Sequence, residues 1–499
     1  MVCKFKPYLK GSKWRCNKLL MLMTGVLTYL PFSIGCKKLI TLDAPVTSIN
    51  TGNVYSTAPT AIAVLTGIYS KMSGSFSGYF SFSTGSNSIA LTAGLSADEL
   101  TLYSGISNAS YIGFYKNALT ANPTASIGAD YWVDLYNCIF LCDSALEGLN
   151  KAAALPSAVR QQLLGEARFL RAFCYFYLVN LYGDVPLVTT TDYQVNAALP
   201  RTSSNAVYEQ MITDLIDAQN LLSADYLNGD IQPYPPASVQ RLRPTKWAAS
   251  ALLARVYLYK GDYANAEAQA STIIEQAWLF QLEDLDNVFL QNSREAIWQL
   301  QPVNAGRNTE DAFAFIIPST GPSDAYGGVP AYLSPYLLQA FEANDQRKNN
   351  WVGQVTVDAD TYSYPYKYKL TVEMPVNEYL MVLRLAELYL IRAEARARQG
   401  NLSGAADDLN AVRKRAGLDN TSADTQTALL SAILHEKQVE LFSEWGHRWL
   451  DLKRTGKVNE VMTMVTPQKG GTWNANWQWY PLPFSDLQKN SRLQQNPGY

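Results

Sequence analysis

Aromatic residues in irregular, polar segments of this 499-residue chain are the side chains best suited to bind a ligand. The candidates, with two polar neighbours, are Tyr79, Asn87, Tyr103, Tyr111, Arg307, Tyr326, Tyr332 and Trp351. Sugar rings present C–H faces that pack on Tyr and Trp, and Asn87 and Arg307 could contact the sugar hydroxyls. For any one aromatic residue, partial packing in the core is the favoured interpretation. As a set, they predict a platform for a glycan.

Ionisable residues that could suggest acid–base chemistry gather late in the chain. They are Glu440, His447, Arg448, Asp451 and Arg454, and His447 and Asp451 are four residues apart, on one face of a helix. A structural network of ion pairs where helices meet the core is the favoured interpretation. A glycosidase would need two carboxylates roughly 5–10 Å apart in a cleft. Because no such pair stands out, no catalytic residue is predicted.

Metal and cofactor sites have little support in the sequence. Asp98 and Glu99 could hold a calcium ion or a sugar hydroxyl, although an acidic pair at a helix start is favoured. Two histidines and no CxxC motif give poor support for zinc. Cys138, Cys142 and Cys174 are expected to be small buried hydrophobes. No metal and no cofactor is predicted, and the question of calcium stays open.

The elements that must position these residues are organised around the stretch Gly165–Val188. Its large apolar residues recur at helical spacing and predict a buried helix, which Gly183 ends. Further helices are expected at Thr57–Met72, Asp130–Leu149, Ser204–Leu222, Thr245–Tyr259, Tyr263–Ala277, Tyr379–Gln399 and Leu402–Ala416.

Two helix pairs share one kind of turn. Gly261–Ala266 and Gly400–Ala405 both follow the pattern Gly-[Asp/Asn]-[Tyr/Leu]-x-x-Ala between alanine-rich helices, which is typical of tetratricopeptide arrays. The full repeat consensus and a regular period are absent. We therefore predict a mainly α fold, in which tetratricopeptide-like helix pairs form a scaffold with large irregular loop insertions and a few short strands.

Irregular segments interrupt this scaffold. Insertions are expected at about 73–127 and 283–378, with a C-terminal irregular block at 465–499. Ser73–Ser96 has no helical period and predicts a long loop, while Ala296–Leu300 and Tyr364–Leu370 could be short strands. A long structureless loop in a compact protein is usually either functional or a wrong assignment of secondary structure. Residues 57–499 are predicted to form a single domain.

The N-terminal residues 1–35 have the pattern of a signal peptide. A basic region precedes the apolar run Leu19–Phe32, which is too short to span a bilayer comfortably. Ser33-Ile34-Gly35-Cys36 then favours a lipoprotein signal, with Cys36 acylated as the first mature residue, over an ordinary secretory signal with an incidental cysteine. Residues 36–56 would be a polar tether.

The charge balance excludes nucleic acid as an expected partner. The whole chain has a formal net charge of −2, and residues 1–35 contain six Lys and Arg but no Asp or Glu. The remainder is therefore more acidic, and no basic stripe or run is present.

Short motifs are distributed along the chain, in the segments Cys36–Leu39, Gly67–Tyr69, Glu166–Ala172, Gly183–Leu187, Arg243–Lys246, Ala251–Leu258, Leu383–Leu390, Glu440–Arg454, Tyr480–Pro483 and Gln495–Tyr499. Together these segments resemble the SusD/RagB family of outer-membrane nutrient-binding lipoproteins. The segments cover most of the mature chain in the expected order.

This resemblance implies a non-catalytic lipoprotein at the cell surface, anchored by lipid in the outer membrane. Such proteins cap a SusC-like TonB-dependent barrel and help to capture a glycan, or in some members a peptide, for import. They contain four tetratricopeptide-like helix pairs. Trp473, Trp477 and Trp479 are a rival aromatic cluster, for which core packing or contact with the barrel is favoured because they precede the matching Tyr480–Pro483 segment.

Several functions stay open at this stage. An oligosaccharide-capturing protein is the leading hypothesis because the loops are rich in Tyr and Trp. A peptide-capturing member of the same import machinery is the alternative. A glycosidase on a helical scaffold ranks far behind, and a tetratricopeptide scaffold that binds only a protein partner is a fourth possibility.

Overall fold

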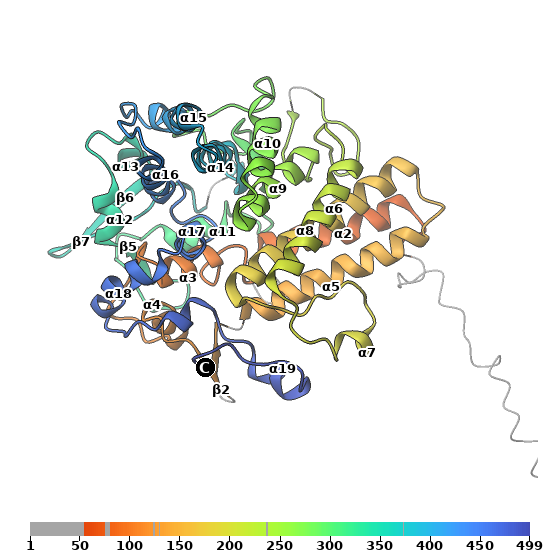
Figure 1. Cartoon of the computed structure of the whole chain (residues 1–499), viewed down its shortest axis with the longest axis horizontal. Helices are drawn as coiled ribbons and strands as arrows, with labels where there is room; N and C mark the ends of the chain where they lie inside the picture. The colour runs from red at the N-terminus through yellow and green to blue at the C-terminus, as the bar shows by residue number, and fades with distance from the viewer. Residues whose placement is uncertain (1–53, 75–79, 123–124, 129, 236–237, 373) are drawn as a thin grey trace, which may run out of the picture. The chain divides into compact units, whose positions relative to one another are not determined.

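The computed structural model describes residues 54–74, 80–122, 125–128, 130–235, 238–372 and 374–499. Residues 55–499 form one compact unit that is mainly helical, which confirms the predicted fold class (Figure 1). Two site predictions, acylation of Cys36 and ligand contact by Tyr79, lie outside the described residues. The signal-peptide segment lies outside them as well.

The helices are α2 (Ala58–Ser73), α3 (Ile89–Ser96), α4 (Ala109–Tyr115), α5 (Asp130–Lys151), α6 (Ser157–Tyr182), α7 (Tyr193–Asn196), α8 (Ser204–Leu221), α9 (Lys246–Lys260), α10 (Tyr263–Ile274), α11 (Glu310–Phe315), α12 (Pro335–Ala340), α13 (Gln346–Trp351), α14 (Leu385–Arg398), α15 (Leu402–Arg415), α16 (Gln426–Glu440), α17 (His447–Arg454), α18 (Val458–Gln468), the 3₁₀ helix η4 (Ala475–Gln478) and α19 (Phe484–Lys489). The strands are β1 (Leu100–Leu102), β2 (Thr120–Asn122), β3 (Ala125–Ile127), β4 (Ala296–Leu300), β5 (Ala331–Leu333), β6 (Val352–Val357), β7 (Asp360–Pro365) and β8 (Leu380–Arg384).

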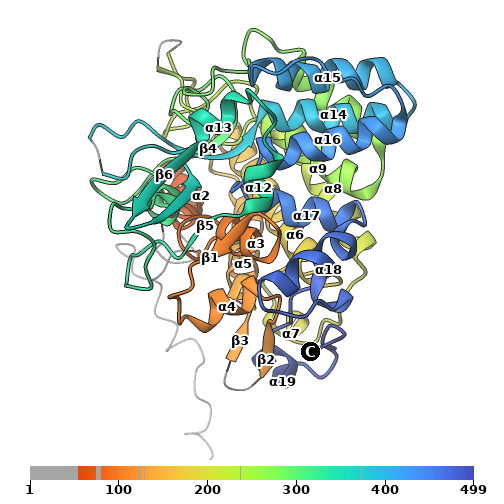
Figure 2. The ribbon, with the colours of Figure 1, turned by 90° about the vertical axis from the view of Figure 1, so that its left-hand side faces the viewer.

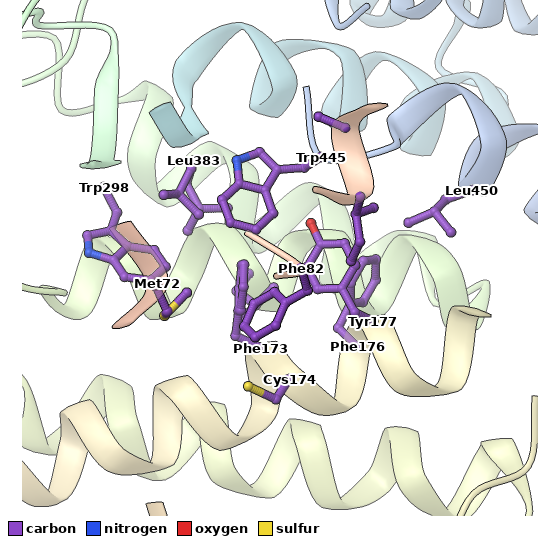
Figure 3. Packing of buried hydrophobic residues seen from close by; sticks show 14 of the residues in the cluster. Met72, Phe82, Phe173, Cys174, Phe176, Tyr177, Trp298, Leu383, Trp445 and Leu450 are labelled. Atoms are coloured by element: carbon purple, nitrogen blue, oxygen red, sulfur yellow. The ribbon is translucent and has the colours of Figure 1, made fainter. Parts of the chain in front are cut away.

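Helix α6 lies at the centre of the hydrophobic core. It packs against α5 and α8, and its aromatic side chains are buried. Figure 3 shows Phe173 of α6 packed with Trp298 of β4 and with Trp445, which precedes α17. The ring centroids of Phe173 and these two residues are 5.6 and 5.3 Å apart, both edge to face. The helix therefore joins segments distant in the sequence, and the aromatic residues of the Gly165–Val188 stretch are core.

The two predicted helix pairs are confirmed. Gly261 and Gly400 have φ angles of 82° and 84°, the left-handed conformation that a tight turn between antiparallel helices requires. Asp262 and Asn401 then cap the return helices by accepting hydrogen bonds from backbone amides 3.2 and 3.0 Å away. Helix α10 packs on α14, so the α9–α10 and α14–α15 pairs lie next to each other, with α16 against α14 (Figure 2).

Strand pairing corrects two of the expected boundaries, and a buried helix corrects one expected loop. The helix predicted from Tyr379 begins only at Leu385, because residues 380–384 form β8, antiparallel to the predicted strand β4. All five residues of β8 are buried, so their apolar pattern does not separate a strand from a helix. The strand expected at Tyr364–Leu370 ends at Pro365 as β7. The segment expected to be an unbroken loop contains α3, which is buried throughout and so lacks amphipathic periodicity.

The late ionisable cluster is a structural network, as predicted. Glu440 accepts hydrogen bonds from Arg347 at 2.9 Å and from Arg384 at 2.6 Å, and it also pairs with Arg415. Arg454 binds both Asp451 and Glu394. Burial lowers the pKa of His447 to about 4, which leaves the imidazole neutral near pH 7.

Asp98 and Glu99 lie after α3 rather than at a helix start, which corrects that expectation. Both Asp98 oxygens accept hydrogen bonds from Arg448, at 2.8 and 2.6 Å, and Glu99 accepts one from the Ser443 amide at 2.9 Å. These partners occupy both Asp98 oxygens and one of the two Glu99 oxygens. In the described ranges, no three His, Cys, Asp or Glu side chains come together to hold a metal ion.

The three cysteines Cys138, Cys142 and Cys174 are buried free thiols, as predicted. Among the helices that the structure describes, none has both the length and the apolar character needed to cross a membrane.

Replacement of Trp298 by alanine is expected to destabilise the fold by about 3–5 kcal/mol, because it empties a fully buried site against α6. Urea unfolding measures the change. Trp278→Ala is the matched control, since Trp278 is 70% exposed and its loss should change stability by about 0.5 kcal/mol or less. Equal losses in the two variants would contradict this assignment of the core.

Replacement of Glu99 by glutamine tests the buried carboxyl beside Ser443. Burial raises the pKa of Glu99 from 4.5 to about 7, so the folded state holds this proton more tightly than the unfolded state does. The contribution to stability is complete below about pH 4.5 and is lost as the pH rises to about 7. The melting temperature of Glu99→Gln relative to wild type should therefore rise over this range.

The carboxylate Glu460 supplies the control, because its side chain is 63% exposed and Glu460→Gln should change the melting temperature little. A melting-temperature difference for Glu99→Gln that does not vary with pH would contradict the assigned burial effect.

Candidate functional site

A cavity of about 710 Å³ lies where three irregular parts of the chain meet. They are the loop before α3, the start of α4, and the segment that runs from before α11 to the start of β5. The lining residues are Gly85, Ser86, Asn87, Asn108, Tyr111, Arg307, Glu310, Phe313, Ala314, Ser323, Asp324, Ala325, Tyr326, Gly327, Gly328 and Pro330. Asn87, Tyr111, Arg307 and Tyr326, four of the candidates chosen from the sequence, are therefore brought together.

Tyr326 is the most exposed aromatic side chain at this cavity, and its ring is fully open to solvent. It stands on a closed turn, in which the Gly328 amide donates to the Ala325 carbonyl at 2.8 Å and the Ser323 amide donates to the Val329 carbonyl at 3.0 Å. Gly327 has a φ of 78°, which permits the reversal. The backbone is thus fixed by hydrogen bonds while the ring is free to stack on a ligand.

Two aspartates tie the loops of the cavity together. The Asp324 carboxylate accepts hydrogen bonds from the Ser107 amide at 3.0 Å and from the Ser107 hydroxyl, which joins the Tyr326 turn to the segment before α4. Asp311 accepts from the Thr84 hydroxyl at 2.7 Å and the Gly85 amide at 2.9 Å, which joins α11 to the loop before α3. The cavity is therefore formed without a ligand.

Arg307 forms part of the cavity wall with α11. Its guanidinium lies 4.1 Å from the centre of the Phe313 ring and donates to Glu310 at 3.1 Å. This places a flat cationic group, fixed on an aromatic ring, beside the cavity. Phe313 was not among the candidates, because its sequence context does not separate a core phenylalanine from one at a cavity wall.

Two side-chain amides, Asn87 and Asn108, and the Tyr111 phenol complete the site. The exposed Asn87 side-chain amide has no hydrogen-bond partner within the part of the chain that the structure describes. Tyr111 donates to the Ser86 carbonyl at 3.0 Å, and burial raises the pKa of its phenol. Asn108, which caps α4, also lines the cavity. The Asn87 amide can form hydrogen bonds with hydroxyl groups. The exposed and half-buried rings beside it can pack on C–H faces.

The two cavity carboxylates are already engaged. Glu310 pairs with Arg307 and also accepts a hydrogen bond from Asn304. The hydrogen bonds from Ser107 lower the pKa of Asp324, which is opposite to the shift that a general acid needs near neutral pH. Both groups have structural partners that account for their positions.

Tyr103 and Tyr332 lie in a separate cluster and do not line the cavity. They belong to the β1–β5 region, and each packs edge to face on Tyr362 of β7, with ring centroids 6.1 and 5.2 Å apart. The cluster adjoins the cavity through Pro330, whose carbonyl accepts a hydrogen bond from the Tyr103 amide at 2.9 Å.

Trp351 was wrongly placed among the ligand-binding candidates. Its side chain is fully buried at the end of α13, and its indole N–H donates to the Leu285 carbonyl at 3.0 Å. Lys367 and Arg415 lie over its ring at 4.8 and 5.3 Å. The ring is thus a core partner of the buried ion network.

The C-terminal tryptophans also make structural contacts. Trp473 packs edge to face on the buried Trp449 at 6.2 Å, and Lys453 lies 3.9 Å from the centre of the Trp479 ring. The Trp477 indole donates to the Gly498 carbonyl at 3.3 Å. All three rings are half-buried, so they pack at the edge of the core rather than inside it.

Two family models match separate parts of the chain. One, described as "Starch-binding associating with outer membrane", matches residues 84–258, and the other, described as "SusD family", matches residues 360–499. A relative named SusD-like protein P2, from Formosa agariphila, is 28% identical over 435 residues, which cover 77% of this chain and 83% of the relative.

Solved structures have the same fold. A SusD superfamily protein from Bacteroides vulgatus has a TM-score of 0.74 at 19% identity, covering 89% of this chain and 99% of that one. A laminarin binding SusD-like protein has a TM-score of 0.71 at 26% identity, covering 88% and 99% of the two chains. The two family matches and the relative at 28% identity together identify the chain as a member of the SusD/RagB family.

Proposed function

We propose that this protein is a non-catalytic binding protein that captures an oligosaccharide in the cavity beside Tyr326. The observation that carries the proposal is the fully exposed Tyr326 ring on a fixed turn, next to the free amide of Asn87 and the guanidinium of Arg307. A pyranose ring has an apolar face that can stack on Tyr326 and hydroxyls that can bind Asn87 and Arg307.

The relatives support a glycan as the ligand class. The structural neighbour at 26% identity is described as laminarin binding, and one of the matching family models carries the description starch-binding. Both ligands are chains of glucose units, so short glucans are the first probes. The absence of a free carboxylate pair at the cavity favours binding over hydrolysis.

Delivery to a transporter and anchoring in the outer membrane are further parts of the proposal. The chain would pass its glycan to a SusC-like TonB-dependent barrel and would be held at the cell surface by lipid on Cys36. The description of one matching family as associating with the outer membrane supports this location. More than one acyl chain on this cysteine would give stable attachment, since each buried methylene contributes about 0.8 kcal/mol.

Replacement of Tyr326 by alanine is expected to weaken binding of laminari- or malto-oligosaccharides at this cavity at least about tenfold, which corresponds to about 1.4 kcal/mol. The fully exposed ring contributes little to stability, so the variant should fold. Isothermal titration calorimetry of the purified protein measures the affinity and the stoichiometry of binding.

Tyr193→Ala is the matched control, because Tyr193 is a 75% exposed tyrosine on α7 that lines no part of this cavity. It should bind as wild type does. Equal binding by wild type and Tyr326→Ala would overturn the assigned site. Saturable binding of a peptide mixture, with no glycan bound, would replace the oligosaccharide by a peptide ligand.

A further inference from the structure

Trp278 is an exposed tryptophan that does not line the Tyr326 cavity. It follows α10, and 70% of its surface is open to solvent, whereas Trp298, Trp351 and Trp449 are fully buried. An indole is the largest apolar side chain, so its exposure gives up burial that would stabilise the fold. A ligand that covers the ring would recover this free energy.

The segment that presents Trp278 is held in place from several sides. Its indole N–H donates to Gln276 at 3.1 Å, and the Leu279 and Phe280 amides donate to the Gln276 carbonyl at 2.8 and 2.9 Å. Arg294 donates to the backbone carbonyls of Ala277 and Trp278 at 3.0 and 3.1 Å. The ring is therefore exposed on an ordered turn, so a ligand would pay little to order it.

Trp278 borders a cavity of about 720 Å³. Three segments form its wall: the connection between α8 and α9, the turn after α10, and the residues before β4. Half-buried Tyr234 adds a second aromatic ring. Below them, buried Arg241 donates to the Tyr226 hydroxyl at 3.3 Å and to the Leu279 carbonyl at 2.8 Å, which gives the cavity a fixed floor.

Two exposed polar side chains at this cavity are free to bind. Neither the Asp225 carboxylate nor the Asn292 amide has a side-chain hydrogen bond or ion-pair partner in the described part of the chain. A carboxylate accepts two or more hydroxyl hydrogen bonds, and an amide both donates and accepts. Arg294 is committed to Gln281 and to backbone carbonyls, and Arg241 is committed as well, so among the described residues that line this cavity no cation is free to bind a phosphate or carboxylate ligand.

We infer that the Trp278 cavity is a second glycan-binding site, in which the indole stacks on a sugar ring while Asp225 and Asn292 bind its hydroxyls. The class of ligand, a glycan, rests on the proposed function. The location of the site does not depend on that proposal. The Trp278 and Tyr326 cavities share no lining residue and are built from different segments.

Two sites on one chain suit a polymer with repeated units. Once one site holds a polysaccharide, the second binds another stretch of the same molecule at high effective concentration, wherever the spacing permits. Long chains would then bind more tightly than short oligosaccharides, although each single contact is unchanged.

The test compares wild type, Trp278→Ala, Tyr326→Ala and the control Tyr193→Ala by calorimetry with short laminari- and malto-oligosaccharides and by affinity electrophoresis in laminarin or starch. Wild type should bind two short oligosaccharides per chain. Trp278→Ala should bind one, with the affinity of the Tyr326 cavity preserved, and should lose at least about tenfold in affinity for the polysaccharide. Far-ultraviolet circular dichroism checks that each variant is folded.

The outcomes separate the two proposals. Wild-type stoichiometry and affinity in Trp278→Ala, with binding lost in Tyr326→Ala, would overturn the second site and leave the first in place. Loss of all binding in Trp278→Ala, with none lost in Tyr326→Ala, would support the Trp278 cavity and overturn the Tyr326 cavity. If wild type binds neither of these glucans, in either format, both sites are rejected as glucan sites.

Discussion

The buried carboxylate of Glu440 is the point on which much of this structure depends. It sits at the end of α16 and pairs with Arg347 of α13, Arg384 of β8 and Arg415 of α15. A buried charge is tolerated only when it is paired, and removing one partner of such a group typically destabilises a protein by about 3–5 kcal/mol. One residue therefore holds together a helix pair, a strand and part of the long insertion.

The same network fixes the insertion at about 283–378, which supplies much of the wall of the Tyr326 cavity and two residues, Asn292 and Arg294, of the Trp278 cavity. Arg384 ends β8, which pairs with β4, and it also binds Glu295 just before β4 at 2.8 Å. Lys367, after β7, donates to the Glu440 carbonyl at 2.7 Å. The segment before β4 carries Arg294, which clamps the Trp278 turn. Loops outside the helical scaffold are in this way anchored to its buried, paired charges, so the two proposed sites lie on ordered backbone.

Local patterns were sufficient to predict the scaffold. Glycines at 261 and 400 mark the helix pairs because only the left-handed conformation closes such turns. The pattern of apolar residues failed to predict secondary structure in segments that are completely buried. Residues 380–384 and 89–96 have no exposed face, so their periodicity carries no information, and the pairing of β8 with the distant β4 decides the first case.

The candidate site was partly predictable. Loop position and side-chain chemistry selected Asn87, Tyr111, Arg307 and Tyr326, which share a cavity. The same criteria selected Trp351, since a sequence does not reveal that Lys367 and Arg415 enclose its ring. Trp278 was missed because a tryptophan just after an amphipathic helix usually packs in the core. Trp278 is exposed because Arg294, 16 positions later, holds its turn in place by hydrogen bonds.

The most direct measurement is a crystal structure of the protein soaked with a short laminari- or malto-oligosaccharide. A sugar ring stacked on Tyr326, with hydroxyls within hydrogen-bond distance of Asn87 or Arg307 and the surrounding loops unmoved, is the expected result. An ordered oligosaccharide bound elsewhere, with the Tyr326 cavity empty at saturating ligand, would contradict the central claim that this preformed cavity captures the glycan.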